Sequence, residues 1–498
     1  MHIYNFQTEF RPAINTILNT VGSKEYRDQR DLFLRIDEIL IHSDLEHRFI
    51  ELSAMENAEE YKKLSNHLQQ RFQTHCRLVL RGNIARVITR LSHREFCARL
   101  ADSYLLQWFL LIDRIDGVKA YAKSTSDRFA NFASVEVMEQ INTELMQRLA
   151  TDKNNLTEVI NLTQSIDFNH AYFDSFCLKA NIHYPVDWVL LRDATRTLMK
   201  ATTIIRSHGL FNRMSQLPLE FLSEINSLCM QMTNVRRKKN AKKSRKKTYR
   251  RMKLLMEKIR HHAETHKEIL KSRGLEETDL TEIQINNIIK RIERVVDQLP
   301  AAIKQAHERI IGERKVSSKD KIVSLYEPEV DIIVRGKSSA EVEFGNKVCI
   351  GELGNGLIVD YQILKNQVSD TKLIAPAIER IKQAELPIAT VWSDRGFCSK
   401  ANTALLQESS MEDGLCPKNP NELKQKLSEQ PGFKEGMKRR AGTEARVSIL
   451  GRLFVGNPCK SKGFENRKKA LGWAVLAHNL WVLARLEQVK PEEVRLAA

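Results

Sequence analysis

The stretch AYFDSFCLKANIHY, residues 171–184, contains one acidic side chain in a segment that otherwise suits a buried β-strand. Its other residues are mostly aromatic, β-branched or small, and such residues fit a strand. A buried carboxylate is costly unless it is paired, protonated or bound to a cation. We therefore expect Asp174 to have partners that come from other parts of the chain.

Alternating apolar and polar residues predict three further strands beyond residue 320. They cover residues 341–353, 356–366 and 386–394, and the turn signal Gly354–Gly356 joins the first two. A helical pattern, KLIAPAIERIKQAE, precedes the last strand. Together with a first strand at 171–181, this order describes an antiparallel meander followed by a helical crossover. It predicts an α/β fold with a mixed sheet flanked by helices, in the outline of a ribonuclease H-like core.

Helical periodicity dominates the remainder of the chain and sets the expected domains. We predict an all-helical N-terminal domain at 1–150, the first part of the ribonuclease H-like core at 165–187, a large helical and basic insertion at 188–320, and the remainder of the core at 321–490. The strand that carries Asp174 would then be separated from the other strands by the insertion.

The composition favours a polyanionic partner. The 498 residues include 79 Lys and Arg against 62 Asp and Glu, a net charge of +17, which points first to nucleic acid. Eight cysteines without a CxxC pair read as reduced thiols. The N-terminus lacks the apolar core of a signal peptide, and the apolar stretch 471–486 is short and contains His478 and Asn479. That stretch is interpreted as a buried helix, and no membrane partner is expected.

One run concentrates the positive charge. Of the eighteen residues from Arg236 to Lys253, twelve are Lys or Arg and none is acidic. A charge run is commonly a solvated helix face, but its length, its single sign and the interleaved Tyr249 favour contact with a phosphate backbone. The candidate DNA-binding residues in it are Arg236, Arg237, Lys238, Lys239, Lys242, Lys243, Arg245, Lys246, Lys247, Arg250 and Arg251.

Two shorter segments are further candidates for phosphate contact. KAYAKSTSDRFANFAS, residues 119–134, offers Ser and Thr helix caps beside Lys and Arg, so a helix N-terminus there could meet phosphate; a capped surface turn is the alternative. Arg335, Gly336 and Lys337 are expected to form a basic turn that could grip phosphate. A solvated loop is the alternative interpretation of that segment.

The predicted strand order brings acids together. The first and fourth strands of such a sheet are neighbours, so Asp174 would lie beside Asp394, which ends the fourth strand. Glu444, on a helix whose Val447, Ile449 and Leu450 could face the sheet, is the third acid. Converging carboxylates require divalent cations, and oxygen ligands suit Mg²⁺ or Mn²⁺. Two such ions can activate one oxygen and stabilise another in phosphoryl transfer.

Each acid has another possible role. Asp394 could cap the following helix, and Glu444 could pair on the surface with Arg440 or Arg446. Glu327, Asp331 and Asp360 are rivals closer to Asp394 in sequence. Asp360 lies inside a predicted strand two strands away from Asp394, and we interpret it as a structural acid.

At these residues the chain resembles DDE-type transposases of bacterial insertion sequences and is similar to the ISNCY-like group. The resemblance extends over most of the chain, through LSHREFCARLADS, KSTSDRF, FDSFCLKANIHYPVDWVLL, SLYEPEVDIIVRGK, VEFGNKV, VDYQI, SDRGF, RAGTEARVSIL and LGWAVLAHNL. SDRGF alone carries little weight, whereas the ordered set is specific.

The resemblance implies that Asp174, Asp394 and Glu444 are the catalytic and metal-binding residues, with two Mg²⁺ or Mn²⁺ ions as cofactors. It places Arg440 at a basic position four residues before the Glu. A Lys is usual seven residues after it, where this chain has Gly451 with Arg452 adjacent; Phe176 likewise replaces a usual Thr. Arg440 and Arg452 are therefore added to the DNA-binding candidates.

The expected function is a transposase that cleaves the ends of its element and transfers the strands to target DNA. Its partners would be double-stranded DNA, as terminal inverted repeats and target, and a second protomer in the synaptic complex. A bacterial cytoplasmic location, on the nucleoid when bound, is expected. The alternatives are a metal-dependent DNA endonuclease without joining activity and a domesticated, non-catalytic DNA-binding protein.

Overall fold

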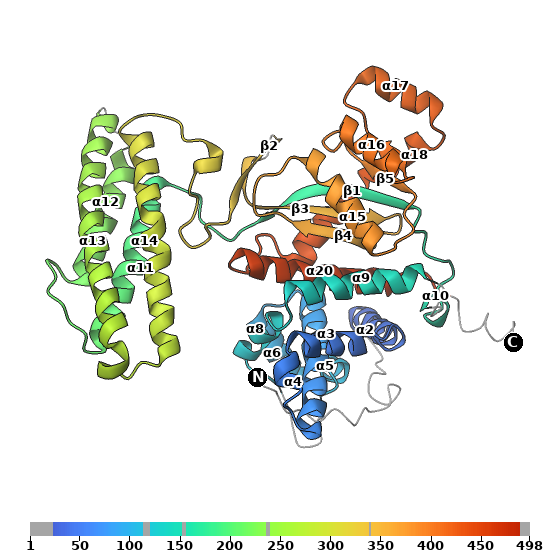
Figure 1. Cartoon of the computed structure of the whole chain (residues 1–498), viewed down its shortest axis with the longest axis horizontal. Coiled ribbons are helices and arrows are strands. Elements are labelled where there is room, and N and C mark those ends of the chain that lie inside the picture. Colours follow the sequence, from blue (N-terminus) through green and yellow to red (C-terminus); the bar gives the residue numbers. More distant parts are fainter. Residues whose placement is uncertain (1–22, 113–119, 152–155, 236–239, 338–339, 489–498) are drawn as a thin grey trace. The chain divides into compact units, whose positions relative to one another are not determined.

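The structure, a computed structural model, describes residues 23–112, 120–151, 156–235, 240–337 and 340–488. The chain divides into two compact units, one made of Met1–Lys179 with Asn346–Ala498 and the other of Ala180–Gly345. Asp174 and the N-terminal helices belong to the first unit. Figure 1 shows the whole chain, coloured from the N-terminus in blue to the C-terminus in red.

Amphipathic helices make up the N-terminal part of the first unit. They are α2 (Lys24–His42), α3 (Leu45–Glu56), α4 (Ala58–Tyr61), α5 (Asn66–Thr89), α6 (His93–Asp102), α7 (Tyr104–Phe109), α8 (Lys123–Ala130), α9 (Val135–Ala150) and α10 (Leu156–Val159). The buried guanidinium of Arg81 on α5 bonds to Asp37 of α2 at 2.6 Å and to Glu46 of α3. A buried charge is stable there because both carboxylates pair with it.

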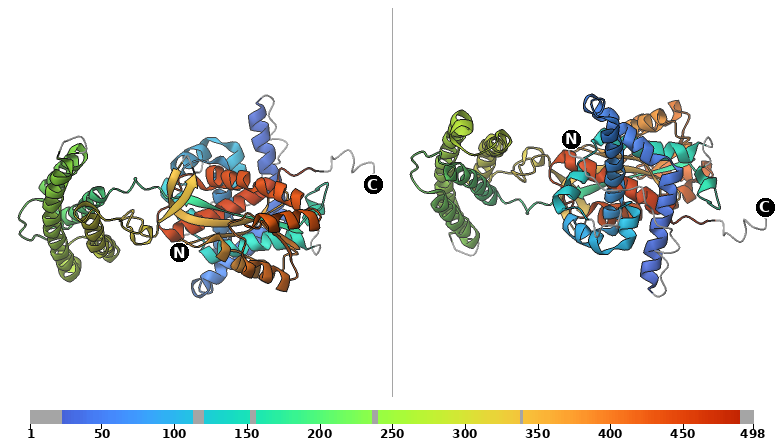
Figure 2. Two further views of the ribbon diagram at one scale, coloured as in Figure 1. Left: turned by 90° about the horizontal axis from the view of Figure 1, so that it is seen from above. Right: turned by 90° about the horizontal axis from the view of Figure 1, so that it is seen from below.

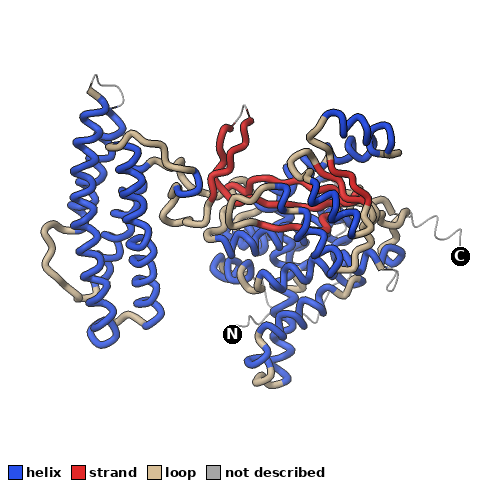
Figure 3. The backbone as a smooth tube through the Cα atoms, turned by 45° about the horizontal axis from the view of Figure 1, so that its top comes forward, coloured by secondary structure: helices blue, strands red, loops and turns tan. Residues whose placement is uncertain are grey.

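The sheet consists of β1 (His170–Lys179), β2 (Asp331–Lys337), β3 (Ala340–Leu353), β4 (Ile358–Ile363), β5 (Thr390–Ser393) and β6 (Glu412–Leu415). Its order is β2-β3-β1-β5-β6, and β4 also pairs with β3. Strand β1 runs parallel to β5, and β5 parallel to β6, whereas β3 pairs with β2 and β4 in antiparallel fashion. Figure 3 shows these strands in red, with helices around them. The expectation of a mixed sheet flanked by helices is confirmed.

The neighbouring position of the first strand and the strand at 386–394 is also confirmed, because Phe173 lies opposite Ser393 in the register of β1 and β5. Two strands were not foreseen. Strand β6 is only four residues long and reads EDGL, with no alternating apolar pattern. Strand β2 includes Arg335 and Lys337, so the predicted basic turn is wrong: their backbone continues the ladder with β3. The side chains of those two residues lie outside what the structure describes.

Helices cover the sheet and separate it from the N-terminal part. The covering elements are η4 (Asp370–Lys372), α15 (Ile374–Gln383), α16 (Lys400–Glu408), α17 (Pro420–Glu429), α18 (Phe433–Ala441), α19 (Thr443–Ile449), the π-helix η5 (Leu450–Val455) and α20 (Phe464–Leu483). Helices α9 and α20 run side by side between the sheet and helix α5 (Figure 1). The apolar stretch within 471–486 lies in α20 up to Leu483 and is mostly buried, as expected. No helix in the described ranges is long and apolar enough to cross a membrane.

The helix expected to carry Glu444 is two helices. Helix α18 ends at Ala441 and α19 begins at Thr443, with Gly442 between them. The continuous helix predicted for this segment is therefore wrong at that residue. Beyond α19 the backbone widens into the π-helix, a feature that single-sequence periodicity does not reveal and that often occurs at functional sites.

The second unit contains a bundle of four helices, α11 (Asp187–Ser207), α12 (Pro218–Asn234), α13 (Ala241–Glu277) and α14 (Glu282–Ile310), followed by η3 (Ser318–Asp320). These helices lie alongside one another (Figures 1 and 2). Their apolar stripes meet in one core that contains Leu198, Phe221, Met256 and Ile292. Asp187, which begins α11, is buried and paired with Arg309 of α14 at 2.8 Å.

Candidate active site

Asp174 lies in the middle of β1, on the face of the sheet covered by α18 and α19. Strand side chains alternate, so it shares this face with Tyr172. Tyr172 packs with Trp392 of β5 and Phe433 of α18 in a small apolar cluster, and its ring stacks on Trp392 at a centroid distance of 6.2 Å. The cluster fixes the two strands and the helix against one another directly beside the carboxylate.

Asp394 follows the last residue of β5 and comes to the same edge of this face. Because Phe173 pairs with Ser393, the next residues along the two parallel strands are Asp174 and Asp394. The Oδ1 of Asp394 accepts a hydrogen bond from the backbone N–H of Gly396 at 2.9 Å. It does not cap the next helix, α16, whose N-cap is Ser399. The capping alternative for Asp394 is therefore excluded.

Glu444 and Arg440 approach Asp174 from the helices above the sheet. Glu444 is exposed in the first turn of α19, and the Arg440 guanidinium, near the end of α18, lies 3.9 Å from the Asp174 carboxylate. Helix α18 comes so close to β5 because residue 436 is glycine, where a Cβ would overlap the Trp392 ring. Among the described residues Arg440 forms no ion pair with Glu444, and its buried Nε lacks a hydrogen-bond partner there.

The pKa of Asp174 reflects its burial and the charges of the two other acids. The pKa of its carboxyl is raised to about 6, mainly by burial and also by the charges of Asp394 and Glu444, against the hydrogen bond from the Ser175 N–H and the charge of Arg440. Its side chain is 15% exposed. The structure thus brings together Asp174, Asp394, Glu444 and Arg440, four of the residues singled out in the sequence.

The donor set suits a hard divalent cation, because it consists of carboxylate oxygens around a partly buried carboxylate. Within the described ranges no three acidic, His or Cys side chains are close enough to form a ready-made metal site. The charges of Asp394 and Glu444 add to the burial that raises the pKa of Asp174, and a bound cation would neutralise both effects.

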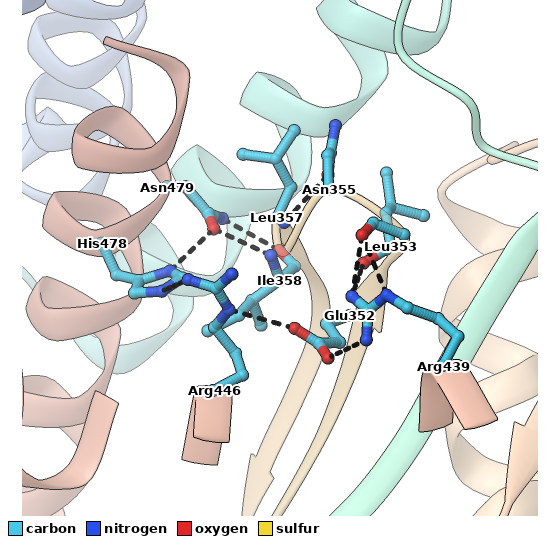
Figure 4. Close-up of polar contacts among 10 residues, drawn as sticks. Glu352, Leu353, Asn355, Leu357, Ile358, Arg439, Arg446, His478 and Asn479 are labelled. Atoms are coloured by element: carbon cyan, nitrogen blue, oxygen red, sulfur yellow. Dashed lines mark hydrogen bonds and ion pairs between the residues drawn. The ribbon is translucent and has the colours of Figure 1, made fainter. Parts of the chain in front are cut away.

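A buried glutamate, Glu352 of β3, ties together the two helices that carry Arg440 and Glu444. Its Oε1 is 3.1 Å from Arg439 of α18 and its Oε2 is 3.1 Å from Arg446 of α19 (Figure 4). Its side chain is 1% exposed. Arg446 lies two residues from Glu444, so this carboxylate positions the start of α19. The suggested surface pairing of Glu444 with Arg446 is not present, because Arg446 is turned to Glu352.

The network continues from Arg446 into α20. The Arg446 guanidinium lies 3.3 Å from Nε2 of His478, whose pKa is lowered to about 3 by burial and by the charge of that arginine. His478 is therefore neutral and accepts the bond. Its neighbour Asn479 bonds both backbone groups of Ile358 at 2.8 and 2.9 Å (Figure 4). Sequence reasoning missed this network, although adjacent polar residues within the apolar stretch of α20 were a visible signal.

A further acid lies on the opposite face of β1. Asp370, which begins η4, accepts hydrogen bonds from Ser175 at 2.9 Å and from Lys347 at 3.0 Å. Ser175 is adjacent to Asp174 and points the other way. This contact supports the strand from behind at the position of the catalytic candidate, and no sequence pattern pointed to it.

The rival acids have other surroundings. Asp360 on β4 is buried and forms two bonds to Arg380 of α15, at 2.6 and 2.8 Å, so its interpretation as a structural acid is supported by its pairing. Asp331 and Glu327 belong to the second unit. Burial alone raises the pKa of Asp331 to about 6, without a contribution from a neighbouring charge.

The structure describes only part of the basic run. Arg236, Arg237, Lys238 and Lys239 lie outside the described residues, and the rest of the run opens α13. Tyr249 is fully buried in the bundle and donates a hydrogen bond to the Ile303 carbonyl at 2.7 Å. It is a core residue, so its interpretation as an aromatic interleaved for DNA contact is wrong.

The remaining basic side chains of the run differ in their partners. Lys242 and Lys246 pair with Glu313 at 2.8 and 2.9 Å, and Arg251 is 4.0 Å from Glu224. Arg245 is half-buried. Lys243, Lys247 and Arg250 are exposed, with no ion pair to any residue in the described part of the bundle, and their spacing places them on one helix face.

Comparison with known proteins gives one match. Residues 334–480 match the family model described as transposase DDE domain. Neither the curated proteins nor the solved structures contain a significant match. The matched stretch includes Asp394, Arg440 and Glu444, whereas Asp174 reaches the site from outside it, through the pairing of β1 with β5. The similarity of residues 334–480 to a transposase DDE domain confirms the resemblance of this chain to DDE-type insertion-sequence transposases.

Proposed function

We propose that this protein is a transposase that uses divalent metal ions to cleave the ends of its insertion sequence and to transfer the strands into target DNA. The observation that carries the proposal is the meeting of Asp174 with Asp394 and Glu444, recorded in the raised pKa of Asp174. These residues lie far apart in the sequence, on elements that meet only in the fold. A structural role alone does not require three acids at one edge of a sheet.

Asp174, Asp394 and Glu444 would hold two Mg²⁺ or Mn²⁺ ions through their carboxylate oxygens. When bound, such ions activate an attacking oxygen and stabilise the leaving oxygen in phosphodiester chemistry. The protein itself orients these ligands: β1 and β5 fix the two aspartates, and the Glu352 network fixes the helix that bears Glu444. Arg440, with a spare guanidinium donor beside Asp174, would bind the oxygens of the scissile phosphate.

DNA contacts away from the site would use exposed cations. Lys243, Lys247 and Arg250 form one stripe on α13 that suits a phosphate backbone. Arg452, exposed on the π-helix after α19, would supply the basic group that the family has near this point. The N-terminal helices would read the terminal inverted repeat, and two protomers would be needed to join two ends.

Two alternatives share part of this site. A metal-dependent endonuclease would cleave with the same acids without joining strands, and a domesticated DNA-binding protein would bind without cleaving. The intact set of three acids and an unpaired arginine donor favours catalysis over the second alternative. Inverted repeats and a target duplication flanking the gene would favour the transposase over both.

The proposal is tested with a plasmid that carries the gene together with its native flanking DNA. Purified full-length protein is incubated with it in Mg²⁺ or in EDTA, and the products are mapped by primer extension. Metal-dependent cuts at the flanking ends that expose 3′-hydroxyl groups, followed by joined products, are expected. Cuts without joining would support the endonuclease, and binding without cuts would support the non-catalytic protein.

A further inference from the structure

A cavity of about 560 Å³ opens in the first unit between the N-terminal helices and the segment that follows α19. Helices α5, α6 and α8 form one wall. The other wall is formed by η5, by residues 460–462 and by the first turns of α20. None of the three metal-ligand candidates lines it.

The cavity is strongly basic. Its walls carry six cationic side chains and one acidic one, Asp127; the cations are Arg86, Arg90, Lys123, Arg452, Lys460 and Lys462. In the described part of the chain none of the six has a salt bridge, whereas Arg30, Arg48 and Lys347 of the same unit each pair with an acid. Six like charges with a single acid among them repel one another and disfavour the folded state. An anionic ligand would relieve that repulsion.

Arg86 adds an observation that is independent of the charge count. Its Nε is buried and has no hydrogen-bond partner among the described residues. Burial lowers the pKa of this guanidinium. A buried donor without an acceptor destabilises the fold, so a group of this kind at a cavity wall favours an acceptor that enters from outside. A guanidinium fork suits the oxygens of a phosphate.

Two helices that begin near the cavity wall have no side-chain cap at their N-termini. Helix α8 begins at Lys123 with Ala122 as its N-cap, and α20 begins after Gly463, so neither has a side-chain cap. Ser124, Thr125 and Ser126 lie inside α8 and do not cap it, whereas Ser134, at the end of the segment expected to offer Ser and Thr caps, caps α9. Helix α6, in contrast, is closed by a capping box from Ser92 and Glu95. Uncapped N–H groups at the wall favour an anion.

We propose that this cavity binds a phosphate group of a nucleic acid strand, at a contact separate from the catalytic acids. The proposal rests on the proposed function in taking nucleic acid as the ligand. The exposed side chains of Lys123 and Lys462 form part of the rim, and Arg86 lies deeper in the wall. Since η5 follows α19 directly, a strand held here lies on the same unit as Glu444, and its binding fixes the N-terminal helices and the catalytic segment on one DNA molecule.

The test measures the affinity of the full-length protein for a fluorescein-labelled DNA duplex in EDTA, so that no cleavage occurs. Fluorescence anisotropy is recorded between about 50 and 200 mM salt. The pocket variant is Lys123→Gln with Lys462→Gln. The matched control is Lys24→Gln with Lys63→Gln, which removes the same charge from exposed positions that do not line the cavity. All four lysines are exposed, so both variants keep the fold, which circular dichroism verifies.

The pocket variant is expected to bind the duplex roughly 10-fold more weakly than wild type, and to lower the slope of log affinity against log salt by about 2. The control is expected to change either quantity much less. Equal losses in both double variants would overturn the inference. The inference would also be overturned if the pocket variant bound the duplex like wild type and lost only the increase in melting temperature that inorganic phosphate produces. Because the assay reads binding without cleavage, failure of the proposed catalytic function leaves this outcome unaffected.

Discussion

A single carboxylate, Asp174, carries much of what is distinctive at the scale of residues. Its pKa of about 6 means that the metal-free fold holds this group at an energetic disadvantage above that pH. The same arrangement suits a cation, which would remove the penalty on binding. Sequence reasoning identified the acid from its strand-like surroundings, and it could not have supplied the burial that raises the pKa.

Replacing Asp174 by Asn is therefore expected to stabilise the protein in EDTA. The carboxyl of the unfolded chain titrates near pH ~4 and that of the folded chain near 6, so its contribution to stability is complete below ~4 and is lost as the pH rises through 6. At pH ~8 the variant should exceed wild type by on the order of 2 kcal/mol in its free energy of unfolding. Urea denaturation at pH ~4.5 and pH ~8 measures this difference.

The control for this stability test is Asp28→Asn, at an exposed position of α2. It should behave like wild type at both pH values. An Asp174→Asn protein that is no more stable than wild type at the higher pH would contradict the account of a destabilised, cation-ready carboxylate.

At the scale of elements, the position of α19 depends on contacts that come from β3 and α20. Glu352 and Arg446 form a buried pair next to the helix turn that bears Glu444. The sequence predicted strand 341–353 and the burial of α20, because both have strong apolar patterns. It could not predict the Glu352 pairing, the break at Gly442 or the π-helix, because each depends on contacts between segments distant in the chain.

Glu352→Gln is expected to impair catalysis beyond its effect on folding. Glu352 and Asp360 lie on adjacent strands, and each is buried and paired with arginine. Asp360→Asn is therefore a matched control. Each change should cost about 3 kcal/mol of stability. At a temperature where both variants are folded, only Glu352→Gln should raise the Mg²⁺ concentration needed for half-maximal cleavage. Equal Mg²⁺ dependence in the two variants would remove the positioning role of Glu352.

Gly356→Ala tests the same network from the backbone. Gly356 has φ of +94°, and a Cβ there would overlap the guanidinium of Arg446. Gly209 has φ of +88° with nothing within 4 Å of such a Cβ, so Gly209→Ala reports the backbone strain alone. Both variants should lose about 1 kcal/mol from strain. Gly356→Ala should in addition lose most of its cleavage activity, measured on the plasmid substrate, whereas equal activities would exclude a role for the Arg446 position.

At the scale of the whole molecule, the chain is divided into two units whose sequences differ in how much of the structure they predict. The order of the apolar segments predicts the parallel pairing of β1 and β5. It therefore also predicts the neighbouring positions of Asp174 and Asp394. The bundle was predicted only as helical periodicity. Packing within the bundle divides the basic run into lysines paired with Glu313, the core residue Tyr249 and the free stripe of Lys243, Lys247 and Arg250. Composition does not encode this packing.

The free stripe on α13 should contribute to DNA binding without sequence preference. Replacing Lys243, Lys247 and Arg250 by Gln removes three exposed cations, and the slope of log affinity against log salt should fall by about 3. The comparison is Lys242→Gln with Lys246→Gln, whose charges already pair with Glu313. These should change the slope by less for each residue replaced. A larger effect per residue from the paired lysines would refute the assignment.

The central claim is that acids from both sides of the long intervening helical segment form one metal-dependent site for DNA cleavage. It is tested most directly by Mg²⁺-dependent cleavage of the plasmid with native flanks, using Asp174→Asn, Asp394→Asn and Glu444→Gln. The control is Asp331→Asn, because burial raises the pKa of Asp331 to about 6, as for Asp174, but no neighbouring charge contributes. Each of the three variants should lose at least about 100-fold in rate, and the control should retain wild-type cleavage. Undiminished cleavage by any of the three, or an equal loss in Asp331→Asn, would contradict the account.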